Sequence, residues 1–286
     1  MDVDLVSIAI RTLGFVATLQ AAGIAVFSAC FSAHLNVSAT PIRRLGLGAA
    51  LIGLVLVLAH QSLEAARMAG DFGGLWSADL QMRAMQSSIG AANSTRVAAL
   101  LVIATSLTRK GAPWRLLGVC GAMLLVFAFL LTGHTSTHPL RWLLAPLLLI
   151  HVSIVAFWFG ALPCLMLAGR REERTATVHL YSRFTAAATW LVPLIAFAGL
   201  LMAFIFIPNA GVLHEPYGEL LIVKLGMFVA LMLLAALNKW RWSPAIATGG
   251  TRVAITLRRS MALECTLIVC VLAVTAALTG LYSPEP

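Results

Sequence analysis

LLAPLLLIHVSIVAFWFGALPCLMLA, residues 143–168, is the stretch that decides the fold. It has no charged side chain, and its most polar interior group is the imidazole of His151. At about 1.5 Å per helical residue, this run is longer than the roughly 30 Å of hydrocarbon in a bilayer. The stretch therefore predicts a membrane-spanning helix.

Seven further apolar runs have a similar length. Together with the run that contains His151, the expected spans are 5–33, 45–68, 84–107, 114–133, 140–168, 184–207, 219–238 and 261–282. Hydrophobic residues make up 60% of the 286 and charged residues only 11%, a composition outside the range of soluble globular domains. We predict an all-α polytopic membrane protein, an eight-helix bundle. The linkers are short, so residues 1–286 should form a single integral membrane domain.

The first run is preceded by Asp2 and Asp4 and has no small-residue cleavage motif, so it is typical of a first span rather than a signal peptide. The five cysteines lie inside apolar runs without a CxxC pair, which favours neither a disulfide framework nor a zinc knuckle. The net charge of +9 comes from arginines in short loops, so we expect the lipid bilayer and no nucleic acid as partner.

The distribution of basic residues predicts the orientation. The loops after the first, third, fifth and seventh spans, with their helix ends, hold 14 of the 20 Lys and Arg residues. The positive-inside rule places these loops on the inner side of the membrane and both termini on the outer side.

Three histidines lie at one predicted depth near the outer side. Counted from the nearest inner arginines, His60, His134 and His151 lie roughly 24 to 29 Å above the inner boundary. Imidazoles within hydrocarbon are costly unless they bind something, so the layer indicates a metal or haem site. A single intramembrane histidine can also serve as a hydrogen-bonding group between helices, and this alternative stays open for His60.

Other candidate ligands lie on the same side. His138 precedes Pro139 and is expected to be a loop ligand, and Met85 would supply a thioether, which suits Cu(I). His214 is a further loop residue on that side, whereas His34 and His179 lie near the inner side. Surface solvation for the loop histidines and ordinary packing for Met85 are the alternatives.

Charged residues inside the spans are expected to support this site. Arg96 is too deep for its side chain to leave the bundle, and Glu64, one turn beyond His60, could orient the imidazole or pair with Arg96 or Lys224. Snorkelling to the interface is the alternative for Glu64 and Lys224.

Several short motifs occur along the chain, most densely from about residue 132 onward. They are Thr132-Gly133-His134, His151 with Trp158-Phe159-Gly160-Ala161-Leu162, Arg183-Phe184, Tyr217-Gly218 with Leu220-Leu221 and Lys224, Asn238-Lys239, Leu257-Arg258-Arg259-Ser260 with Glu264, and Pro284-Glu285-Pro286. In these motifs and their order, the chain resembles the CopD-type copper resistance membrane proteins, which include the PcoD and YebZ branches. Thr135, Ala161 and Lys239 depart from the family pattern, but none of these departures replaces an imidazole.

The resemblance implies copper, as Cu(I) or Cu(II), with no organic cofactor and no enzymatic activity. It implies a location in the bacterial inner membrane, where the predicted outer side, with both termini, is the periplasm. It also implies a permease moving copper from periplasm to cytoplasm, with a periplasmic CopC-like chaperone as a partner. Two alternatives remain at this point. One is a b-type haem protein with His60 and His151 as axial ligands, and the other is a factor that delivers copper to another membrane enzyme.

Overall fold

In the computed structural model, residues 3–207, 211, 215–246 and 251–280 are described, without the side chains of His134 and Thr251. These residues form helices and connecting turns, with no strand among them. The long helices are α1 (Val3–Cys30), α2 (Ala39–Ala69), α4 (Ser88–Thr108), α5 (Ala112–Phe127), α7 (Arg141–Arg171), α8 (Arg174–Phe206), α9 (Pro216–Leu237) and α11 (Thr251–Gly280). The short elements are η1 (Ser32–His34), η2 (Phe72–Trp76), α3 (Ala78–Gln86), η3 (Ala128–Leu131), α6 (His134–Thr137), the π-helical turn η5 (Asn238–Trp242) and α10 (Ser243–Ala245).

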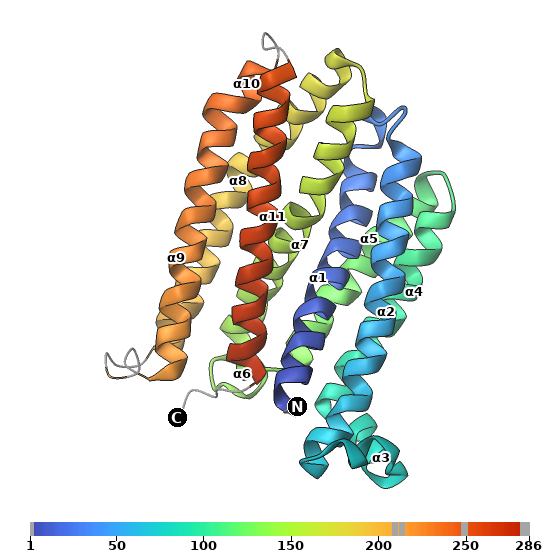
Figure 1. The fold of residues 1–286 in the computed structure, drawn as a ribbon, viewed down its shortest axis with the longest axis vertical. Helices are drawn as coiled ribbons and strands as arrows, with labels where there is room; N and C mark the ends of the chain where they lie inside the picture. Colours follow the sequence, from blue (N-terminus) through green and yellow to red (C-terminus); the bar gives the residue numbers. More distant parts are fainter. Residues whose placement is uncertain (1–2, 208–210, 212–214, 247–250, 281–286) are drawn as a thin grey trace.

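Eight of the described helices are long and apolar enough to cross a membrane, which confirms the predicted fold class. Helices α1, α7 and α11 pack against one another at the centre. Helices α2, α4 and α5 cover one side of α1, whereas α8 packs on α7 and α9 packs on α11 (Figure 1). The beginning of α1 and the end of α11 lie at the same end of the bundle (Figure 1). We call this the terminal end.

The closest contact in the centre is between α1 and α7. A Cβ atom built on Gly160 would lie 2.4 Å from the backbone carbonyl carbon of Gly23, and one built on Gly23 would lie 1.8 Å from the carbonyl oxygen of Ala156. Small residues let membrane helices approach until their backbones touch, and the gain is van der Waals packing. The Phe159-Gly160-Ala161 segment is therefore a packing motif for α1.

Several helices extend beyond the predicted spans. Helix α8 begins at Arg174, ten residues before the apolar run at 184, because basic side chains on the first turns do not disfavour a helix outside the hydrocarbon. The run predicted to begin at 84 is divided at Ser87, whose hydroxyl accepts from the backbone N–H of Gly90 at 3.2 Å and caps α4. The apolar core of each span was predicted correctly, whereas the ends depended on caps and loop contacts.

At the end opposite the termini, Glu172 holds two loops together. One carboxylate oxygen accepts from the backbone N–H groups of Asn36, Val37 and Ser38 at 2.9, 3.0 and 2.8 Å, and also from the Ser38 hydroxyl. Partial burial raises the pKa of this carboxyl group, but the four hydrogen bonds outweigh burial and leave the pKa below its usual value. Glu172 thus fastens the α1–α2 connection to the turn between α7 and α8.

Basic residues at this end also have structural partners. Arg43 donates to the carbonyl oxygen of Leu107 at 2.9 Å, Arg115 donates to the hydroxyl of Ser32 at 2.6 Å, and Arg174 donates to the carbonyl oxygen of Ile246 at 3.0 Å. Helix C-termini leave carbonyl groups unsatisfied, and guanidinium groups satisfy some of them here. These arginines therefore brace the loops in addition to any role in topology.

Candidate functional site

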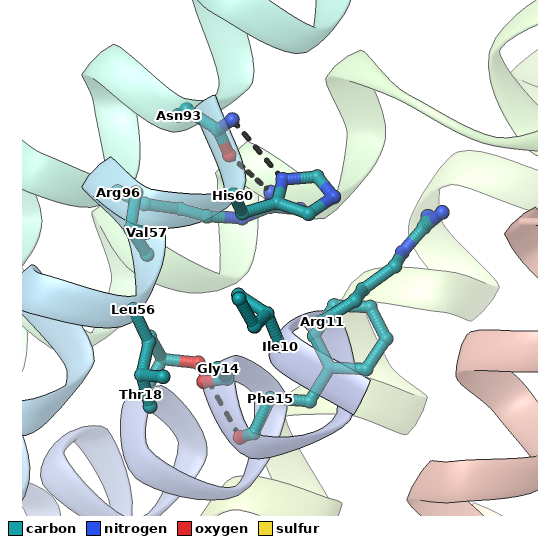
Figure 2. Close-up of a pocket in the computed structure, with 10 residues that line it drawn as sticks. All are labelled: Ile10, Arg11, Gly14, Phe15, Thr18, Leu56, Val57, His60, Asn93 and Arg96. Carbon is teal, nitrogen blue, oxygen red and sulfur yellow. Dashed lines mark hydrogen bonds between the residues drawn. The ribbon is translucent and has the colours of Figure 1, made fainter. Parts of the chain in front are cut away.

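A polar cluster surrounds His60 between α1, α2 and α4, and Figure 2 shows His60 with Asn93, Arg96 and Arg11. His60 is 7% exposed, and its Nδ1 lies 3.4 Å from the side-chain nitrogen of Asn93. The same nitrogen donates to Gln61 at 2.9 Å, while the Asn93 side-chain oxygen accepts from Arg96 at 2.8 Å. Because an amide N–H faces Nδ1, this arrangement assigns the ring proton to Nε2. As placed, neither ring nitrogen of His60 has a free lone pair for a metal.

Glu64 lies beside His60, as expected for a carboxylate that orients the ring. Its Oε1 is 3.3 Å from His60 Nε2, a contact that falls short of hydrogen-bond geometry. The suggested pairing of Glu64 with Arg96 or Lys224 is not formed. Glu64 instead forms an ion pair at 3.2 Å with Arg67, which lies three residues later on the same helix.

The cavity next to His60 is small. It has a volume of about 20 Å³ and is lined by side chains that include Arg11, Asn93 and Arg96 (Figure 2). A volume of this size is enough for about one water molecule. It has no room for a porphyrin.

A much larger cavity has a volume of about 280 Å³. Its walls come from α1, α7, α8, α9 and α11, with Arg96 from α4 and with η3 and α6 near the terminal end. Most of the lining is apolar, and the polar exceptions include His151, Arg11, Arg96 and Lys224. We call this space the central cavity.

His151 is the imidazole that the structure places in the wall of the central cavity. The Ile195 carbonyl group faces the ring without reaching hydrogen-bond geometry, and the buried Nδ1 has no hydrogen-bond partner among the described residues. Gly199 lies directly beside the ring, since a Cβ atom there would be 3.2 Å from Cε1. A buried imidazole nitrogen without a partner is costly unless it binds a ligand. Met202, also in the wall, adds a thioether to the same cavity.

The other candidate histidines lie near the terminal end. The backbone of His134 begins α6, and its neighbours Gly133 and Thr135 both line the central cavity, whereas its side chain is outside the described part of the structure. The Nδ1 of His138 accepts from the backbone N–H of Leu140 at 3.0 Å, and its ring makes an edge contact with Phe206. His214 is outside the described residues.

Met85 does not line either cavity. It lies in α3, is 50% exposed and belongs to neither cavity wall. Exposure of this kind suits a surface or interfacial methionine. The sequence signal for Met85 was its position near the periplasmic side, which does not specify the direction of a side chain.

Trp158 has two contacts of different kinds. It lines the central cavity, while its indole N–H donates to Glu264 on α11 at 3.2 Å. Glu264 also accepts from the side-chain nitrogen of Asn238 in η5. The three side chains are buried and connect α7, η5 and α11. Trp158 therefore has a structural partner as well as a cavity face.

The structure thus separates the predicted site into two regions. His60 and Glu64 belong to the polar cluster, while His151, Lys224 and Trp158 belong to the central cavity, and Arg96 lines both spaces. Within the described ranges, no three His, Cys, Asp or Glu side chains come together in a metal-binding group. Because His60 and His151 line different cavities, they do not offer the facing pair that the haem alternative needs.

Sequence reasoning missed several residues of these regions. Arg11 lines both cavities, Asn93 and Gln61 complete the polar cluster, and Met202 lies in the central cavity. Arg11 and Asn93 carried a usable signal, because a charged or amide side chain within an apolar run must face the interior of the bundle. Met202 did not, since a methionine in a span is ordinarily a packing residue.

Comparison with known proteins places these features in a family. The family model "Copper resistance protein D" matches residues 178–278, and "Copper resistance protein D-like, N-terminal domain" matches residues 1–139. The copper resistance protein D of Pseudomonas syringae pv. tomato is 31% identical over 99% of this chain and 98% of its own length. The copper transport protein CutJ of Bacillus subtilis (strain 168) is 29% identical over 57% of this chain and 30% of its own length. No solved structure matches. By its family models and its full-length relative, the chain belongs to the copper resistance protein D family.

Proposed function

We propose that this protein is a copper permease of the bacterial inner membrane, with His151 and His134 as the ligands that first hold the ion. The family membership supports copper as the substrate, and the name of the Bacillus subtilis relative refers to copper transport. Eight candidate spans support a multi-pass membrane location. No catalytic role is part of the proposal.

The observation that carries the proposal is the position of His151. Its ring is in the wall of a cavity of about 280 Å³ and has one buried nitrogen without a hydrogen-bond partner. The Nε2 of His60 also lacks such a partner, but the cavity beside His60 has a volume of only about 20 Å³, so His151 has more room for a ligand. His134 is the natural second ligand because its backbone lies between two residues of the same wall. Two imidazoles with the Met202 thioether suit Cu(I) better than a hard cation.

The role of His60 changes under this proposal. Its Nδ1 faces the side-chain amide of Asn93 and its Nε2 lies 3.3 Å from Glu64, so we propose that it holds α2 against α4 rather than binding the transported ion. His138 and Met85, near the terminal end, are proposed to capture copper before it reaches the cavity. A periplasmic CopC-like chaperone could supply the ion there.

Orientation is part of the proposal. The beginning of α1 and the end of α11 are at one end of the bundle, and most of the arginine and lysine residues of the loops belong to the other. The positive-inside rule then assigns the terminal end, with α6 and His138, to the periplasm. Copper would enter from that end and leave toward the cytoplasm, without an ATP-driven domain in the described residues.

Transport can be tested with purified protein in vesicles of known orientation. Copper offered as Cu(I) on the terminal side should accumulate on the other side in proteoliposomes, and not in vesicles that contain the His151→Ala variant. The matched control is His179→Ala on α8, because His179 belongs to neither cavity wall. Copper binding without accumulation in the wild type would favour the delivery alternative over a permease.

A further inference from the structure

The wall of the central cavity has an unusual balance of charge. Three cationic side chains line it, namely Arg11 from α1, Arg96 from α4 and Lys224 from α9, and no Asp or Glu is among the described lining residues. Arginine stays protonated under all relevant conditions, so at least two full positive charges face this space. Such charges are costly inside a bilayer unless something compensates for them.

Contacts within the protein satisfy these groups only in part. Arg11 donates to the backbone carbonyl of Thr279 at 3.1 Å and stacks over Phe15, but it has no ion pair with a described carboxylate. Arg96 is 7% exposed, donates once to Asn93, and leaves its Nε without a partner. Lys224 has no hydrogen bond or ion pair in the part of the chain that the structure describes. Several strong donors therefore remain available at one cavity.

We propose that the central cavity binds an organic anion, with its carboxylate or phosphate group between Arg11, Arg96 and Lys224 and its apolar body against the cavity wall. Ionised donors make strong hydrogen bonds to such oxygens, and arginine can bind them through two parallel N–H groups. Phe129, Phe228 and Met202 are part of the large apolar surface that would hold the body of the ligand. The inference rests on these charges and on the apolar wall, and its test uses no copper.

Other occupants fit the wall less well. A bare metal cation would be repelled by the two guanidinium groups, so copper in this cavity requires an anion beside it or anionic ligands around it. Water alone would solvate the donors but would leave the charge uncompensated and the apolar wall wet. An uncharged apolar molecule would leave the donors unpaired.

The test uses purified protein in an uncharged detergent, with a chelator present and no copper added. Octanoate is the probe, and octanol at the same concentrations is its uncharged match. A ligand that binds the folded state raises the midpoint of thermal unfolding in a saturable manner. We expect octanoate to do so and octanol not to; equal shifts from the two probes would overturn the proposal.

Variants locate the site. Lys224→Met keeps the length of the side chain and removes its charge, and Arg11→Gln removes one guanidinium group. Each should weaken octanoate binding by about tenfold or more, since a hydrogen bond to a charged group typically contributes that much affinity. Lys224→Met should also raise the melting midpoint of the ligand-free protein, because an unpaired buried charge is lost.

Arg83→Gln is the matched control, because Arg83 lies on α3, pairs with Asp79 and is absent from the cavity wall. Unchanged octanoate affinity in both cavity variants would overturn the proposal, as would equal loss in the control. Native mass spectrometry then separates two sources of the anion. An anionic phospholipid retained by the wild type and lost in Lys224→Met would identify a lipid headgroup, whereas octanoate binding without retained lipid would indicate a free organic anion.

Discussion

Replacing Gly160 with alanine should disrupt the packing of α1 on α7. The added Cβ would lie 2.4 Å from the Gly23 carbonyl carbon, 2.5 Å from its Cα and 2.5 Å from the backbone nitrogen of Ile24. All three atoms belong to the backbone of α1, so no side chain can rotate away. The two helices must move apart locally instead.

The size of the effect follows from these distances. Contacts become ordinary near 3.4 Å, so α1 and α7 must separate by about 1 Å at the crossing, and overpacking on this scale costs about 2 to 3 kcal/mol. We therefore expect a lower melting midpoint.

Gly48→Ala and Gly226→Ala are the matched controls. Both glycines are within long helices, and a Cβ atom at either position would have no neighbour within 4 Å. Alanine has a higher helix propensity than glycine, so these variants should melt at the same temperature as the wild type or slightly above it. Thermal unfolding in detergent, followed by intrinsic fluorescence, measures all three. If Gly160→Ala melts like the controls, the close contact between α1 and α7 is refuted.

Two further predictions concern buried or capping carboxylates. Glu172→Gln should lower the melting midpoint at neutral pH, because the carboxylate accepts from Ser38 and the neighbouring backbone N–H groups. The folded-state pKa of Glu172 is below the reference value of 4.5. Its stabilising contribution is therefore complete above pH 4.5 and is lost as the pH falls through the folded-state pKa. The difference in melting midpoint between wild type and variant should shrink on acidification, and a constant difference would contradict this. Glu264→Ala should cost about 1 to 3 kcal/mol by leaving Trp158 and Asn238 without their buried partner, whereas Glu264→Gln should cost less; equal melting midpoints for the two variants would contradict the pairing.

Much of the fold could be predicted because each span is a long apolar run whose length matches the bilayer. The helix ends could not, as Arg174 shows: a basic residue before an apolar run reads as a loop, yet here it begins the helix α8. Glu172 was missed for a related reason, since its partners at 36–38 are distant in the sequence. Caps and loop contacts depend on tertiary proximity, which hydrophobic periodicity does not report.

The candidate site was predictable in depth but not in direction. Counting residues along a helix estimates the height of an imidazole, so His60 and His151 were assigned to one layer. Whether two side chains at one height meet depends on the order of the helices around the bundle and on the rotation of each. The structure gives the order and rotation of the helices, and it places His60 in the cluster at α2 and α4 but His151 in the wall of the central cavity.

The central claim is that copper binds at the central cavity through His151 and His134. Copper bound per protein, measured by elemental analysis after purification and Cu(I) loading, tests it most directly. The claim predicts that His151→Ala and His134→Ala each lower the bound copper, while His179→Ala matches the wild type and His60→Ala retains most of the copper at reduced thermal stability. Unchanged copper content in both His151→Ala and His134→Ala would contradict the claim.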